Sequence, residues 1–114
     1  MKNTILTTCL ALALSSCSLT STTVIGPKDS FVLGNNPHRA FKVSIVNASN
    51  FTISSYHAPI GGGTHSPLTL APNAKAKIKV DKNTALVISN SSADTATVKL
   101  KVTGDTGLSM GYKN

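Results

Sequence analysis

The side chains that could do chemistry in this sequence are two cysteines, three histidines and several lysines at alternate positions. Cys9 lies inside the apolar run of residues 5–14, and Cys17 follows that run after two small serines. Two cysteines in an exported protein would ordinarily pair as a disulfide. Cys9, however, belongs to a segment with the composition of an export signal. Removal of that segment leaves Cys17 as the only thiol, which must then serve another purpose.

The N-terminal segment is short and carries one charged side chain, Lys2, ahead of the apolar run from Ile5 to Leu14. Ten residues suit the hydrophobic region of a signal peptide. At about 1.5 Å per residue they are too few to cross ~30 Å of hydrocarbon as a helix, so a transmembrane anchor is the weaker interpretation. An ordinary secretory signal has small residues three and one positions before the cleavage site, and Leu14 occupies the first of these.

The segment Leu14-Ser15-Ser16-Cys17 resembles the lipobox of bacterial lipoproteins, Leu-(Ala/Ser)-(Gly/Ala/Ser)-Cys. The resemblance implies cleavage between Ser16 and Cys17, diacylglycerol on the Cys17 sulfur, and often a further acyl chain such as palmitate on the new amine. Serine rather than aspartate at position 18 implies sorting to the outer membrane on its periplasmic side, with surface exposure as an alternative. The competing interpretation is a plain signal with an incidental cysteine. The resemblance covers residues 1–17 only.

Lysines alternate with apolar residues in two later segments, at Lys75, Lys77 and Lys79 and again at Lys99 and Lys101. Successive side chains of a strand point to opposite faces, so each set shares one face. If both strands belong to one sheet, five ammonium groups point the same way. Such a surface could bind anionic lipid headgroups or the acidic face of a protein. The alternative is that these lysines are ordinary solvated residues that protect strand edges from aggregation.

The charge balance is strongly basic: eleven Lys and Arg stand against four Asp, with a formal net charge of +7. Removal of the signal peptide takes away only Lys2, which leaves a formal net charge of +6 (+7 − 1). Anionic lipid and acidic proteins are therefore candidate partners. Nucleic acid is the least expected partner, because the chain has an export signal, a single arginine and no aromatic stacking pattern.

The segment 56–67 has no periodicity and contains two prolines and three glycines, so we expect a long loop. Tyr56, His57, Ile60 and His65 make it a candidate binding loop, and the alternative is a loose connector. The two histidines, with His38 or Met110 as a third ligand, are the one combination that could hold copper or zinc. No cysteine or carboxylate lies nearby and the spacing matches no ligand pattern, so we predict no metal. Covalent lipid on Cys17 is the only attached group we expect.

Motifs for catalysis are missing as well. The sequence has no Gly-x-Ser-x-Gly elbow, no paired carboxylates and no phosphate-binding glycine loop before a helix. A nucleophilic serine needs a base within hydrogen-bond reach, and the four aspartates fall in expected turns or in the expected tether. We therefore predict that the protein is not an enzyme.

The expected domain is all-β, because apolar and polar residues alternate in short runs separated by turn residues, and no segment has helical periodicity. We expect a signal peptide over 1–16, a lipidated cysteine and polar tether over 17–30, and a domain over 31–114. Within the tether, Val24-Ile25 before Gly26-Pro27 could already form a short edge strand. With about seven short strands, the domain should be a small antiparallel β-sandwich, with a barrel as the alternative.

These features predict a non-enzymatic binding or structural accessory of an envelope complex, such as secretion or conjugation machinery or an outer-membrane receptor. The chain is similar in architecture to small β-sandwich lipoproteins of type VI secretion, which says little about function. The alternative is an inhibitor or ligand-binding module, such as a lysozyme inhibitor. Such inhibitors usually carry disulfides and a tyrosine-containing motif that this sequence lacks.

Overall fold

The computed structural model describes residues 18–113. Within that range the chain forms nine strands and no helix. The strands are β1 Ser18–Ile25, β2 Ser30–Leu33, β3 Phe41–Asn47, β4 Ile53–Pro59, β5 His65–Leu70, β6 Lys75–Val80, β7 Thr84–Ser89, β8 Ala96–Gly104 and β9 Met110–Tyr112.

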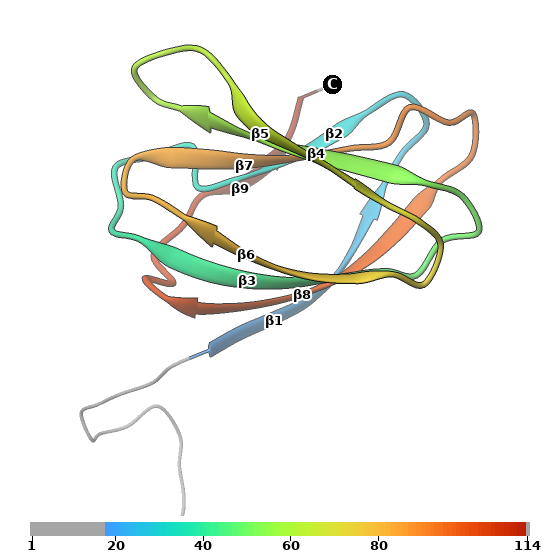
Figure 1. Cartoon of the computed structure of the whole chain (residues 1–114), viewed down its shortest axis with the longest axis horizontal. Helices are drawn as coiled ribbons and strands as arrows, with labels where there is room; N and C mark the ends of the chain where they lie inside the picture. Colours follow the sequence, from blue (N-terminus) through green and yellow to red (C-terminus); the bar gives the residue numbers. More distant parts are fainter. Residues whose placement is uncertain (1–17, 114) are drawn as a thin grey trace, which may run out of the picture.

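These strands form two sheets that pack face to face (Figure 1). The four-stranded sheet has the order β1-β8-β3-β6, and the five-stranded sheet has the order β5-β4-β7-β2-β9. Every neighbouring pair is antiparallel. The predicted all-β antiparallel sandwich is confirmed. Over residues 18–113 the sheets do not close into a barrel, and the nine strands exceed the expected number of about seven.

The core lies between the sheets and follows directly from the alternation in the sequence. In β3, Phe41, Val43 and Ile45 are at most 1% exposed, whereas Lys42 between them faces solvent. Strand β7 has neighbours on both sides in its sheet and five of its six residues are buried. The core is built mostly of Val, Ile and Leu, with Phe31 and Phe41 as its large side chains. Burial of these aliphatic side chains is the main source of stability.

The predicted tether over residues 17–30 is wrong for most of its length. Ser18–Ile25 is strand β1, which pairs residue for residue with β8 from Ser18 opposite Thr103 to Ile25 opposite Ala96. Serine and threonine are common in polar tethers, but β-branched threonine also favours extended structure. Alternate positions of β1 also turn inward, ending in the buried Thr23 and Ile25. Cys17 and the predicted cleavage site lie outside the described residues.

Hydrogen bonds from the five-stranded sheet and its loops fix the C-terminal end of β1. The buried Asn90 Nδ2 donates to the carbonyls of Ile25 and Gly26, both at 3.0 Å. From the edge strand β9, Tyr112 Oη donates to the Val24 carbonyl at 2.7 Å. Strand β1 is therefore an integral part of the sandwich, joined to both sheets.

Candidate functional site

The most strongly charged surface of the described structure is the outer face of the four-stranded sheet. Strand β3 lies between β6 and β8, so the lysines of β6 and β8 share one sheet. Strand β3 adds a sixth lysine, Lys42, which sequence reasoning missed although it alternates with the apolar Phe41 and Val43. All six side chains are exposed. We call this set the basic face: Lys42, Lys75, Lys77, Lys79, Lys99 and Lys101.

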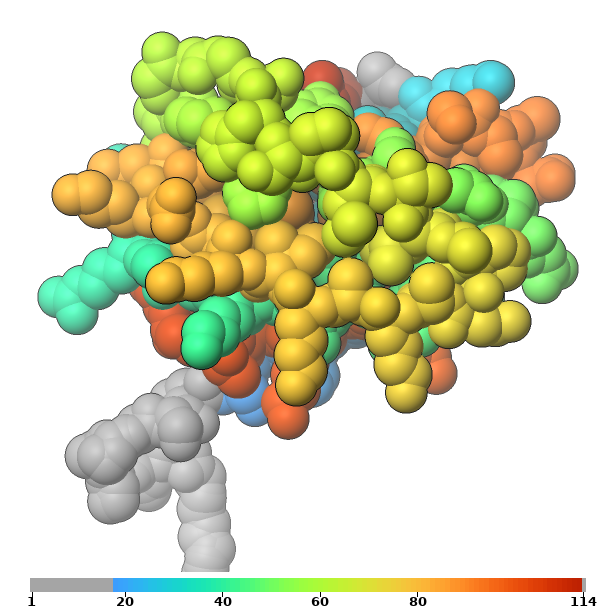
Figure 2. Space-filling model, in the orientation of Figure 1, coloured from blue at the N-terminus to red at the C-terminus, as the bar shows by residue number. Residues whose placement is uncertain are grey.

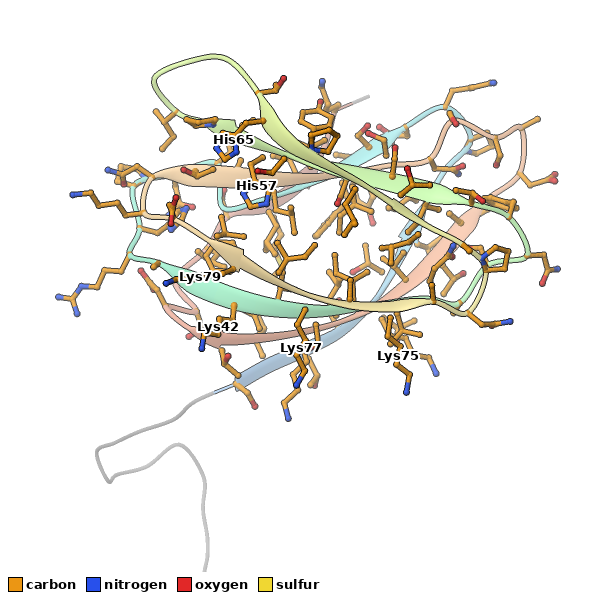
Figure 3. All side chains as sticks on the ribbon, in the orientation of Figure 1. Lys42, His57, His65, Lys75, Lys77 and Lys79 are labelled. Carbon is orange, nitrogen blue, oxygen red and sulfur yellow. The ribbon has the colours of Figure 1, made fainter. Side chains whose placement is uncertain are left out.

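The strand register arranges the basic face in three rows across the sheet. Cross-strand partners have their side chains on the same side of a sheet, so each row is a set of neighbours. From β6 through β3 to β8 the rows are Lys79–Lys42–Thr103, Lys77–Ser44–Lys101 and Lys75–Val46–Lys99. Strand β1 extends these rows with Ser18, Thr20 and Thr22. Figure 3 shows Lys42, Lys75 and Lys77 projecting to the same side of the sheet.

No acidic side chain compensates this charge within the strands. The four aspartates of the chain all lie in connections between strands, at Asp29, Asp81, Asp94 and Asp105. Lys42 and Lys79 stand directly opposite each other, and like charges in that position destabilise a sheet. The basic face therefore costs folding free energy, which a solvated face of mixed charge would avoid.

Two shallow hollows cross the basic face. One, of about 490 Å³, is lined by Lys42, Lys77, Lys79 and Lys101 together with the hydroxyl residues Ser44 and Thr103. The other, of about 450 Å³, lies beside β1 and is lined by Lys99 and Lys101 with Thr20, Thr22 and Ser44. In the space-filling view, long side chains of β6 project from the lower margin of the molecule (Figure 2). Ammonium and hydroxyl groups are all hydrogen-bond donors, so the surface suits oxyanions such as phosphate or carboxylate.

The predicted loop over residues 56–67 is also wrong at both ends. Tyr56 and His57 belong to β4, which pairs along its length with the central strand β7, and His65 begins β5. Only residues 60–64 connect the two strands, with Ile60 exposed in the turn. The prolines and glycines suggested a loop, but pairing with β7 and β5 holds the flanking residues extended. What remains is a short hairpin turn.

The hairpin brings together the two histidines that were singled out from sequence. His57 and His65 are cross-strand partners with ring centroids 5.0 Å apart (Figure 3). His57 is 8% exposed. Its pKa is lowered from 6.5 chiefly by burial and secondly by the nearby His65, while Asp81 opposes the shift. His57 is therefore held in its neutral form near neutral pH.

A cleft of about 350 Å³ opens beside His57, between the edges of β5 and β6. Its lining includes Ser55, Leu68 and Ile78, and the Ser55 hydroxyl is the one fully buried side-chain polar atom of the described residues without a hydrogen-bond partner. Residues 18–113 contain no group of three His, Cys, Asp or Glu side chains that could hold a metal ion. The third histidine, His38, is engaged elsewhere with the carbonyls of Arg39 and Thr84.

Comparison of the chain with known protein families, with curated proteins and with solved structures found no match. No helix with the length and apolar character needed to cross a membrane occurs among residues 18–113.

Proposed function

We propose that this chain is a membrane-anchored, non-enzymatic binding or structural protein of a bacterial envelope. Lipid on Cys17 would hold it at the outer membrane facing the periplasm, and the basic face would bind an anionic partner there. The observation that carries the proposal is the basic face itself. Six exposed lysines share one sheet surface that has no carboxylate, although this arrangement opposes folding.

The chemistry of the described residues supports binding rather than catalysis. The buried His57 has His65 as its ring neighbour, and no aspartate is hydrogen-bonded to either ring to orient it as a catalytic base. The hollows of the basic face are lined by lysines, hydroxyls and aliphatic groups, with no histidine or carboxylate among the lining residues. A multivalent cationic surface does, however, provide long-range attraction and orientation toward an anionic partner.

The anchor is tested by replacing the thiol that would carry the lipid. The Cys17→Ser variant, expressed in a bacterium that processes lipoproteins, should move from the membrane fraction to the soluble fraction or accumulate uncleaved. Mass spectrometry of the parent protein should show a mature N-terminus at Cys17 with the added mass of two or three acyl chains. An unchanged membrane fractionation of Cys17→Ser, or a parent N-terminus without acyl mass, would contradict the proposed anchor.

A further inference from the structure

We infer that the basic face lies flat against anionic phospholipids of the membrane that holds the anchor, so that the four-stranded sheet faces the headgroups and the five-stranded sheet faces away. The inference rests on the proposed lipid anchor at Cys17. It names the partner of the basic face as lipid phosphate rather than an acidic protein.

The first argument is the position of β1. This strand is the edge of the same sheet that carries the lysines, and it begins at Ser18, the residue next to Cys17. A flexible tether at this position would let the domain turn freely relative to the membrane. Residues Ser18–Ile25 form a strand instead. A lipid on Cys17 would therefore hold the rim of the four-stranded sheet at the bilayer surface.

The second argument is the distance from that rim to the lysines. Ser18 is opposite Thr103, Thr103 is opposite Lys42, and Lys42 is opposite Lys79. Three strand spacings put Lys79 about 14 Å from Ser18 across the sheet, and the four-residue step from Ser18 to Thr22 adds about 13 Å along it. Every lysine of the basic face is thus within about 20 Å of the first residue of β1. With the sheet lying against the bilayer, all six lysines are therefore close to the anchored rim.

The third argument is the chemistry of the surface. A membrane presents phosphates in a plane, and the basic face presents its donors from a single sheet surface. The middle row alternates ammonium groups with the hydroxyls of Ser44 and Thr20, and the two other rows end in the hydroxyl residues Thr103 with Ser18 and Thr22. Ammonium and hydroxyl groups can all donate to phosphate oxygen. Charge attraction to lipid fades within a Debye length of about 8 Å at physiological salt, and contact with the surface keeps the lysines inside that distance.

The outer face of the five-stranded sheet, on the opposite side of the molecule, lacks the lysines of the basic face. The five-stranded sheet contributes Tyr56 from β4 and Val32 from β2 to its partly exposed residues, and none of its five strands contains a lysine. In the inferred orientation this uncharged face points away from the membrane. Lipid attraction therefore orients the domain in one way only.

The test measures lysine accessibility in the lipidated protein. The protein is reconstituted into vesicles of phosphatidylcholine alone or of phosphatidylcholine mixed with phosphatidylglycerol, treated with an amine-reactive reagent and mapped by mass spectrometry. We expect labelling of the basic face to fall by about tenfold in the phosphatidylglycerol vesicles and to recover at high salt. Lys82 and Lys113 are exposed and lie outside the basic face, so their labelling should be the same in both vesicles.

A pair of matched variants distinguishes an effect of the basic face from an effect of the protein's net charge. Lys77→Glu with Lys101→Glu reverses the two lysines that flank Ser44 and should abolish the protection of the remaining four. Lys82→Glu with Lys113→Glu makes the same change in net charge and should leave the protection intact. A circular dichroism melt of each variant checks that the sandwich is folded.

Equal labelling of the basic face in both vesicles would overturn the inference, while an acylated, vesicle-bound protein in the same sample would leave the proposed anchor standing. Protection in native envelopes but not in phosphatidylglycerol vesicles would also overturn it and would point to an envelope component other than phospholipid, such as an acidic protein. A protein that does not stay with either vesicle would instead refute the proposed function.

Discussion

Asn90 should be among the most sensitive polar positions of the sandwich, because it joins the end of β7 to the end of β1. Its side chain is 1% exposed. Nδ2 donates to the carbonyls of Ile25, Gly26 and Asp94 at 3.0, 3.0 and 2.7 Å, and Oδ1 accepts the Ser92 amide at 3.0 Å. Asn90→Ala removes all of these bonds and leaves the Ile25 carbonyl buried without this partner.

The magnitude follows from the number of bonds lost. The Asn90 Nδ2 group has two protons, so its three contacts amount to two full hydrogen bonds, and the bond that Oδ1 accepts makes three. At about 1 kcal/mol each, these bonds give a loss of about 3 kcal/mol in the free energy of unfolding. For a domain of this size that loss lowers the melting temperature by roughly 12 to 24 °C. Thermal and urea denaturation of Asn90→Ala and the parent protein measure it directly.

The matched control is Asn50→Ala, since Asn50 is an exposed residue in the turn after β3. Its effect should stay within about 0.5 kcal/mol. Hydrogen exchange adds a local readout, because the amides of β1 should lose protection in Asn90→Ala before those of β3. A loss below about 1 kcal/mol for Asn90→Ala would refute the claim that this side chain holds β1 to the sandwich.

Two further predictions concern His57 and Gly104. The folded-state pKa of His57 lies below 6.5, so the unfolded chain binds its proton more readily and stability must fall as the pH drops from about 6.5 through the folded pKa. Urea titrations across this range should show that the free energy of unfolding depends less on pH in His57→Gln than in the parent protein. In His65→Gln the pH dependence should be reduced only in part. An unchanged pH dependence in His57→Gln would contradict the burial argument. Gly104 has φ +93°, and a Cβ there would lie 3.1 Å from the Ala40 carbonyl oxygen, so Gly104→Ala should destabilise the protein by about 1–3 kcal/mol. The control Gly111→Ala meets nothing within 4 Å and should be neutral, so equal melting temperatures for the two variants would contradict the steric argument.

Predictions from sequence succeeded where one strand's alternation carried the information. The positions of Lys75, Lys77 and Lys79 outside and of Ile78 and Val80 inside follow from a period of two, and the structure agrees. Predictions were wrong where residue type alone was used to assign a tether or a loop, without knowledge of which strands pair with each other. Serine and threonine in β1 suggested a tether, and proline and glycine around His57 and His65 suggested a loop.

The reason is that strand pairing depends on residues far apart in the chain. Ser18 becomes part of a strand because Thr103 is available opposite it, and nothing near Ser18 in the sequence reports that partner. In the same way His57 is extended because β7 pairs with it on one side and His65 on the other. Local composition records propensity, and tertiary neighbours can override it.

The sequence by itself therefore determined the all-β class, the aliphatic core and the orientation of the lysines within each strand, because side-chain alternation is a local property of extended backbone. Only the tertiary structure decided that β3 lies between β6 and β8, which adds Lys42 and turns two separate sets of lysines into one basic face. It also placed β1, beginning beside Cys17, at the edge of that same sheet. Those neighbours are selected by long-range hydrogen bonding and by burial of a shared core, which no single segment encodes.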